Sequence, residues 1–334
     1  KKGIFGSQWV GWENFKYLLN MPDIDKVIWN TFFISGLKLL LGVLVGLAVP
    51  GVVFLMILFL DTRVHSRKDL KGAVSIPFLG EIPQDKKTAK TNVAADQEDS
   101  MLSESFRILR TNMTFMAKKD KPMQVITFTS FNEGAGKTFI SRNLAMSLML
   151  TRKRVVLVDL DIRKGTLSRH FRKHPVGVTN YLADDSIALD DIIHTDEKSG
   201  GLDIISSGTV APNPAELLMD GRLDTLIDEL RKRYDYIIVD NVPVGIVADA
   251  TISNRISDLT IFVARAGKLD RRQLPDMEEL YREGKLRNMS LILNGVDPKR
   301  RGYGYGYGYG YGYGYGYGKH NRKKIKGQET NLPG

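Results

Sequence analysis

The sequence predicts an α/β protein with a doubly wound, mostly parallel sheet, preceded by a transmembrane helix. Short apolar runs alternate with stretches of helical period over residues 101–298, a pattern typical of a parallel sheet covered by helices on both faces. A charge-free apolar run precedes them at 39–60, and a Gly-rich loop directly follows the first apolar strand of the alternating region.

The composition is that of a globular protein with basic flanks. Hydrophobic residues make up 43% of the 334 residues and charged residues 26%, both ordinary for a folded domain. The formal net charge of +10 is gathered in flanks and tails instead of on one helical face, so no nucleic-acid partner is expected. The chain has no Cys, which excludes disulfides, thiol catalysis and cysteine-ligated zinc.

Residues 39–60 are the predicted transmembrane helix. They contain no charged side chain, and their number is enough to cross a hydrocarbon core of about 30 Å as a helix. Arg63, Arg67, Lys68 and Lys71 follow at once. By the positive-inside rule these cations place everything after the span in the cytoplasm. A buried core helix is the alternative interpretation of such a run.

The segments on either side of this span are expected to stand apart from the globular domain. Residues 1–38 form an N-terminal segment whose string WVGWENFKYLL resembles the N-terminal region of sugar-transport permease subunits. A single span cannot form a permease pore, which argues against a transport function. Residues 61–100 are expected to be a polar cytoplasmic linker, with a compact, turn-rich piece at 76–83.

The predicted domain, residues 101–298, opens with a helix from about Ser103 to Lys118 that has one apolar face. Strands are then expected at 125–130, 155–159, 202–206, 236–240, 259–264 and 290–294, and helices at 137–150, 221–234 and 271–283. Right-handed crossovers between such strands make the sheet doubly wound. Ligands of such a sheet bind at the carboxyl ends of its strands.

The loop SFNEGAGKT, residues 130–138, follows a predicted strand and opens a predicted helix, which is the setting of a phosphate-binding P-loop. Glycines let backbone N–H groups turn inward around phosphate oxygens, and the helix N-terminus adds its dipole. Lys137 is expected at the β- and γ-phosphates of ATP and Thr138 on Mg²⁺. The residues expected to bind ATP here are Asn132, Glu133, Gly134, Ala135, Gly136, Lys137, Thr138 and Phe139.

This loop makes the predicted sheet one of P-loop NTPase type, although the first Gly of the usual GxxxxGK[ST] pattern is Phe131. A Gly-rich structural turn is the alternative. Two further strands end in acids. One gives Asp159 and Asp161, followed by Arg163, and the other gives Asp240. Carboxylates beside Mg²⁺ can hold metal waters or accept a hydroxyl proton.

Thr138, Asp161 and Asp240 are therefore the predicted metal ligands, direct or through water. The predicted catalytic residues are Lys137, Asp159, Asp161, Arg163 and Asp240. Asp159 is the candidate base for the acceptor hydroxyl, with Asp161 possible instead. For Asp240 the alternative is a turn or helix-capping role.

These motifs resemble those of bacterial protein-tyrosine kinases attached to polysaccharide chain-length regulators. That family also has an ExxRxxR helix before the P-loop, matched here by Glu104, Arg107 and Arg110. The resemblance implies that these side chains contact a neighbouring subunit in a homo-oligomeric ring. It further implies an inner-membrane location with a cytoplasmic kinase domain, a protein-tyrosine phosphatase partner, and polysaccharide polymerisation and export partners. A solvated, salt-bridged helix face is the alternative for the three charges.

The family's C-terminal tyrosine cluster is matched within residues 299–334, a Gly-Tyr repeat followed by a basic tail. The predicted phospho-acceptors are Tyr303, Tyr305, Tyr307, Tyr309, Tyr311, Tyr313, Tyr315 and Tyr317. The resemblance thus implies an ATP-dependent, non-specific protein-tyrosine kinase that autophosphorylates this cluster in trans and regulates capsule or exopolysaccharide synthesis or export. Full modification would add roughly −12 to −16 charges, which we expect to eject the tail and loosen the ring. A low-complexity linker or a self-associating tract is the alternative.

The main rival is a partitioning-type P-loop ATPase switch, which hydrolyses ATP without phosphorylating tyrosine. That group usually carries a signature Lys early in the loop, where this chain has Asn132. A non-enzymatic, ATP-binding scaffold is a further alternative, but Lys137, Asp159 and Asp161 are all present. Asn294, at the end of the last predicted strand, resembles the adenine-contacting Asn of related ATPases, with a turn residue as the alternative.

Overall fold

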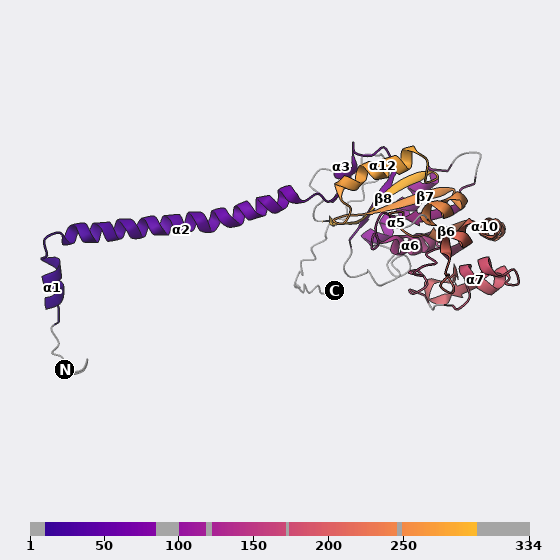
Figure 1. Cartoon of the computed structure of the whole chain (residues 1–334), viewed down its shortest axis with the longest axis horizontal. Coiled ribbons are helices and arrows are strands. Elements are labelled where there is room, and N and C mark those ends of the chain that lie inside the picture. Colours follow the sequence, from indigo (N-terminus) through magenta and orange to yellow (C-terminus); the bar gives the residue numbers. More distant parts are fainter. Residues whose placement is uncertain (1–10, 85–99, 118–121, 172–173, 246–248, 299–334) are drawn as a thin grey trace, which may run out of the picture.

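The computed structural model describes residues 11–84, 100–117, 122–171, 174–245 and 249–298. Figure 1 shows an α/β body from which one long helix, α2, extends. The first ten residues, with the start of the permease-like string, and the C-terminal Gly-Tyr repeat lie outside the described residues. So do residues 85–99 of the expected linker.

The described residues form one sheet of eight strands in the order β1-β8-β7-β2-β6-β3-β5-β4. All neighbouring strands pair in parallel except β4 and β5. The strands are β1 (Phe78–Pro83), β2 (Val125–Thr129), β3 (Val155–Asp159), β4 (Ile193–Asp196), β5 (Leu202–Ile205), β6 (Tyr236–Asp240), β7 (Leu259–Arg265) and β8 (Met289–Val296). The predicted doubly wound, mostly parallel α/β fold is confirmed.

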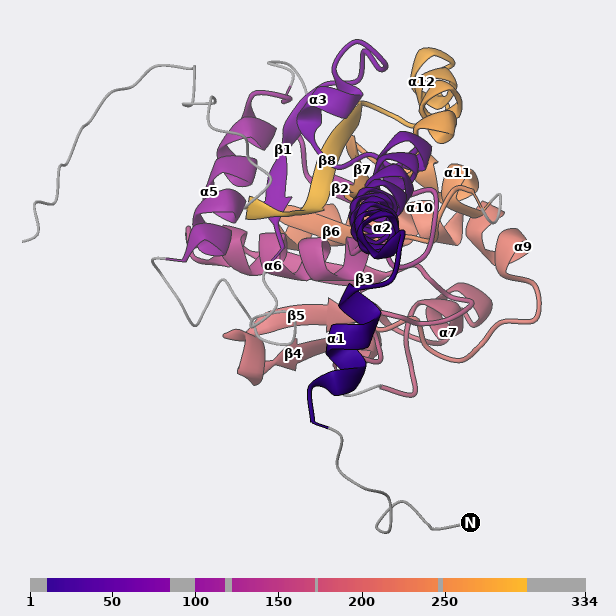
Figure 2. The same ribbon diagram turned by 90° about the vertical axis from the view of Figure 1, so that its left-hand side faces the viewer.

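Alternate residues of each central strand point to opposite faces, because side chains on a strand alternate. On one face, Phe128 and Leu157 pack against α5 (Met101–Thr114) and α6 (Lys137–Met149). On the other, Val156 and Val158 pack against α10 (Arg222–Arg233), together with α7 (Val178–Ala183) and α9 (Pro214–Met219). This second face is covered near β7 and β8 by α12 (Leu274–Arg282). Figure 2 shows these two layers on either side of the sheet.

The helices that the sequence predicted are present with shifted ends. The first domain helix, α5, runs from 101 to 114 instead of 103–118, and its apolar face is buried as expected at Phe106, Leu109 and Met113. Five short helices were not predicted: α3 (Arg67–Leu70), α7, α8 (Leu189–Ile192), α9 and α11 (Asp249–Ser253). Neither was α1 (Glu13–Leu19).

The expected linker is in part a structural element of the domain, which corrects its assignment. Residues 78–83 form β1, a parallel edge strand beside β8, and Val64, Leu70 and Ile82 are buried in the apolar core. Val64 donates its N–H to Leu269 O at 2.8 Å and accepts from Gly267 N at 2.8 Å. The α/β unit therefore begins close to residue 62, ahead of the predicted start at 101.

The apolar helix is longer than the charge-free run. Helix α2 spans Ile24–Leu60, so it begins well before Leu39 and absorbs part of the expected N-terminal segment. Among the described residues it is the one helix with the length and apolar composition to cross a membrane, and none of its residues is buried by the rest of the described structure. Pro50 lies inside it, as membrane helices tolerate.

Candidate nucleotide site

The P-loop lies between the end of β2 and the start of α6, as predicted. Gly134 and Gly136 have φ angles of 71° and 95°, a left-handed region that glycine adopts without strain. A Cβ atom on Gly136 would lie 2.1 Å from Nδ2 of Asn294. That amide is buried and donates to Ala135 O at 2.8 Å. Asn294 thus contacts the P-loop at Ala135 and Gly136 and helps to hold its shape. Its contact with adenine stays a prediction.

Asp240 ends β6, the strand beside β2, and its carboxylate faces the first turn of α6. Thr138 Oγ1 donates to Asp240 Oδ2, while Oδ1 is buried and has no hydrogen-bond partner among the described residues. Burial raises the pKa of Asp240 to about 6, and the nearby Lys137 charge opposes that rise. A buried oxygen without a partner is costly unless a ligand engages it. Asp240 is therefore suited to face a cation.

Asp159 ends β3 and pairs in register with Asp240. Its side chain is fully buried and accepts from Ser168 N at 2.8 Å, Ser168 Oγ at 2.6 Å and Asp161 N at 3.0 Å. Burial raises the pKa of Asp159 to about 7, and the charge of Asp240 adds to the rise. A carboxyl group with a pKa near neutrality is suited to proton transfer at physiological pH.

Asp161 lies two residues further and keeps a small exposed surface of 8%. Its carboxylate accepts from Lys164 N at 3.1 Å and from Thr166 Oγ1 at 2.9 Å. The structure thus brings Asp159, Asp161 and Asp240 to one edge of the sheet beside the P-loop, as the strand-end pattern predicted. Arg163 is exposed.

The remaining predicted loop residues have distinct surroundings. Asn132 Nδ2 lies 3.5 Å from Gln273 Oε1, and Glu133 pairs with Lys164. Phe139 packs its ring on Phe106 of α5, with ring centroids 6.1 Å apart. Phe131, where the usual pattern has Gly, is buried and packs edge-on against Phe262 at 5.1 Å.

Two cations beside the loop were missed from the sequence. Lys268 follows β7, and its Nζ lies 3.1 Å from the position a Cβ on Gly134 would take. Arg265 ends β7 and comes within 3.6 Å of the Cβ position of Gly136. Burial lowers the pKa of Arg265. The signal available in the sequence was their position at and just after the end of an apolar strand, because the carboxyl ends of parallel strands lie at one edge of the sheet.

The ExxRxxR side chains are only partly available to a neighbour. Arg107 Nη1 pairs with Glu104 Oε2 at 2.5 Å, and both side chains are about half exposed. Arg110 Nη1 donates to Ser147 O at 2.6 Å, which ties α5 to the end of α6. The contact of all three with another subunit stays a prediction, and Arg110 has a role within its own chain.

Several known proteins are similar to this chain in sequence. Residues 123–266 match the family model of the AAA domain. The tyrosine-protein kinase YwqD of Bacillus subtilis is 34% identical over 204 residues, covering 61% of this chain and 85% of YwqD. A Klebsiella pneumoniae relative, whose name places it in the cps region, is 32% identical over 299 residues, covering 84% of this chain. This chain spans 41% of that relative's length.

The solved kinase domain of the Escherichia coli tyrosine kinase ETK superposes with a TM-score of 0.65 at 29% identity. The superposition covers 74% of this chain and all of that domain.

Proposed function

The chain belongs to the family of bacterial tyrosine-protein kinases, and from this premise we propose that it transfers the γ-phosphoryl group of ATP to tyrosines of its own C-terminal repeat. The observation that carries the proposal is the match to YwqD over 85% of that kinase, together with an intact P-loop beside three strand-end carboxylates. The reaction forms a bond between the Tyr oxygen and the γ-phosphorus and breaks the bond to the β–γ bridging oxygen. ADP leaves, and the phenolic proton passes to a carboxylate.

The residues present fit ATP and Mg²⁺. The left-handed glycines let the loop N–H groups turn inward, and the positive charge of Lys137 favours the ionised forms of Asp240 and Glu133. Asp240 Oδ1 is a buried oxygen without a partner among the described residues, and Thr138 lies directly against the same carboxylate. Thr138 and Asp240 would hold Mg²⁺, with Asp161 through water. The ion would neutralise charge on the phosphates as the bond breaks.

Proton acceptance falls to the carboxylate pair at the carboxyl end of β3, Asp159 and Asp161. The raised pKa of Asp159, about 7, suits a base, while Asp161 is the one with exposed surface toward an incoming hydroxyl. The three donors on Asp159 fix its orientation. Substitution of each by Asn, read out as the pH profile of phosphate transfer, separates the two roles. Loss of the ionisation near pH 7 in one variant identifies the base.

Membership of the family supports the following proposal for the cellular role. The acceptors are the tail tyrosines at 303–317, modified in trans within a homo-oligomeric ring. Helix α2 anchors the chain in the bacterial inner membrane with the α/β body in the cytoplasm. The regulated process is capsule or exopolysaccharide synthesis, with its polymerisation and export proteins and a tyrosine phosphatase as partners. The Klebsiella relative's place in the cps region supports this role.

Mass spectrometry of the full chain in detergent tests the proposal. The chain is incubated with Mg-ATP beside a Lys137→Met variant and a Lys232→Met control, whose exposed side chain lies on α10. Phosphates on Tyr303 to Tyr317 in the wild type and control, but not in Lys137→Met, are the expected result. ATP turnover with an unmodified tail would overturn it and leave an ATPase switch.

A further inference from the structure

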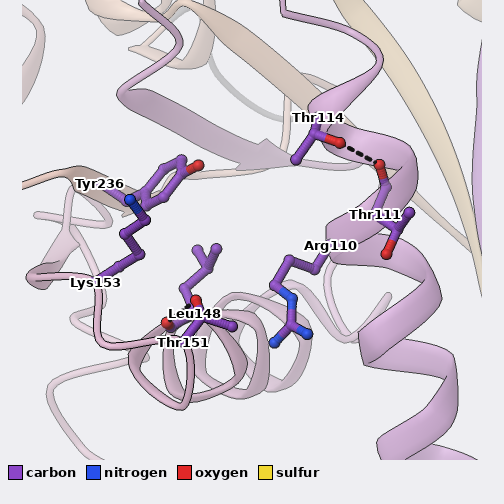
Figure 3. A pocket seen from close by; sticks show the side chains of 7 residues that line it. All are labelled: Arg110, Thr111, Thr114, Leu148, Thr151, Lys153 and Tyr236. Carbon is purple, nitrogen blue, oxygen red and sulfur yellow. Dashed lines mark hydrogen bonds between the residues drawn. The ribbon is translucent and has the colours of Figure 1, made fainter.

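A cavity of about 230 Å³ lies at the edge of the sheet opposite the P-loop. Figure 3 shows its lining: Tyr236 and Lys153 on one side, Arg110, Thr111 and Thr114 on the other, and Leu148 with Thr151 between them. Tyr236 begins β6 and Lys153 precedes β3, so the cavity is at the amino ends of the strands. It is therefore separate from the nucleotide site at their carboxyl ends.

The cavity combines two cations with an apolar, partly aromatic wall. The Arg110 side chain lines the cavity while its Nη1 donates to Ser147 O. Lys153 is exposed and lies at the rim of the cavity. The nearby carboxylate of Asp235 is held by Arg154, which donates to it from Nη2 at 3.0 Å and from its backbone N–H at 2.9 Å. That acid is therefore already neutralised, and the cavity has a positive balance.

The hydroxyl groups of the lining are committed to helix carbonyls. Thr111 donates to Arg107 O at 3.0 Å, Thr114 to Thr111 O at 2.7 Å, and Thr151 to Leu148 O at 2.6 Å. Their methyl groups, with Leu148 and the ring of Tyr236, supply apolar surface. A ligand for such a cavity has an anionic end for the cations and a flat apolar body for the ring.

We propose that this cavity binds a phosphotyrosine of the Gly-Tyr repeat at residues 302–318. Phosphotyrosine carries about −1.5 to −2 charges on a flat ring, which matches a cavity with one cation on each side and the ring of Tyr236 in its wall. Arg110 and Lys153 hold the phosphate, and Tyr236 packs against the ring. This inference rests on the proposed function, which supplies the phosphate.

The position of the cavity disfavours a lipid headgroup as its ligand. The chain enters the α/β body from α2 at Val64, which is hydrogen-bonded to the loop after β7 at the carboxyl edge of the sheet. The cavity opens at the amino edge, away from that entry. Product tails held there would be kept out of the nucleotide site, so phosphorylation would proceed without competition from finished tyrosines.

Peptide binding to the full chain in detergent tests the inference without requiring kinase activity. The chain carries Lys137→Met and is titrated with a synthetic Gly-Tyr peptide bearing one phosphotyrosine, the same peptide unphosphorylated, and inorganic phosphate. Fluorescence anisotropy is the readout. The phosphopeptide is expected to bind at least about tenfold tighter than either competitor, because charge-assisted hydrogen bonds and ring burial both contribute.

Variants at the rim then locate the site. Lys153→Gln is expected to weaken phosphopeptide binding about tenfold, Lys153→Arg to restore most of it, and Lys232→Gln to leave it unchanged. Equal binding of both peptides, displacement by inorganic phosphate at the same concentration, or an unaffected Lys153→Gln would each overturn the inference. Tail phosphorylation in the mass spectrometric experiment is a separate result, so the failure of one proposal is distinguishable from the failure of the other.

Discussion

Thr138 donates its hydroxyl hydrogen to Asp240, so the first turn of α6 is fastened to the carboxyl end of β6. The other carboxylate oxygen of Asp240 is buried and has no partner in the described part of the chain. One side chain thus both positions the P-loop helix and keeps an oxygen for a ligand.

Asp240→Asn is expected to weaken Mg²⁺-dependent nucleotide binding by about 10- to 100-fold, because it removes a negative charge from the metal's surroundings. Titration of a fluorescent ATP analogue with and without Mg²⁺ measures this. Binding in the absence of Mg²⁺ is expected to change little. Equal losses under both conditions would mean that Asp240 acts on the loop and not on the metal.

Gly136→Ala is expected to abolish detectable nucleotide binding. Its Cβ would lie 2.1 Å from the Asn294 amide, and the φ of 95° is strained for any other residue. The measurement is the same titration, with Gly221→Ala as the matched control, because a Cβ there meets nothing and φ is −63°. Normal binding by Gly136→Ala would contradict the loop geometry.

Lys268→Met is expected to weaken ATP binding about tenfold and AMP binding much less. The Lys268 ammonium lies close to Gly134, where it can reach the phosphates. It would take the role of the Lys that partitioning-type ATPases carry at the position of Asn132. Lys285→Met, an exposed change beyond α12, serves as the control. Similar losses for ATP and AMP would place Lys268 away from the outer phosphates.

Ile82→Ala is expected to lower the free energy of unfolding by about 2–5 kcal/mol, as for other buried Ile-to-Ala changes. Ile82 lies in β1 and is 1% exposed. Urea unfolding of the full chain, followed by circular dichroism, checks the value against Gln84→Ala, whose side chain is exposed. A change below about 0.5 kcal/mol would show that β1 adds little to the domain.

The stacked pair His174 and His194 predicts a loss of stability in acid. Their ring centroids are 3.4 Å apart, and each ring has a buried nitrogen without a hydrogen-bond partner among the described residues. Burial and the neighbouring His174 lower the pKa of His194. Below the ordinary histidine pKa of about 6.5, the unfolded chain then binds a proton that the folded chain does not, so stability falls as pH falls.

His194→Phe is expected to flatten this part of the pH dependence. The unfolding midpoint is compared with that of the wild type between pH 5 and pH 8. The difference between the two proteins is expected to favour the variant increasingly below pH 6.5. A constant difference across the range would count against the pair as the cause.

Much of the fold could be predicted because its signals are local. In the sequence, the buried strands β3 and β6 are apolar runs that end in Asp, and their boundaries match the sequence prediction. The strand-end carboxylates and the P-loop were likewise visible, because their spacing alone places them at one edge of a parallel sheet.

The missed elements depend on partners far away in the sequence. Strand β1 contains a Gly and ends in a Pro, and its register with β8 is irregular. Such a strand is tolerated at a sheet edge but has no strand pattern of its own. Strand β4 pairs antiparallel at the other edge with only one apolar residue in four. Lys268 approaches Gly134 only through folding of the chain between them.

The hydrogen bonds that hold residues 62–64 to the loop at 267–271 have a geometric consequence. Thr62 O accepts from Arg271 N at 2.8 Å and Arg63 Nη1 donates to Gly267 O at 3.0 Å, directly after α2 ends. With the proposed anchor in place, this short connection between α2 and the α/β body keeps every copy in a thin layer under the bilayer. Copies then meet by lateral diffusion in two dimensions, so crowding within the membrane, more than total abundance in the cell, would set how often one tail finds another copy's site.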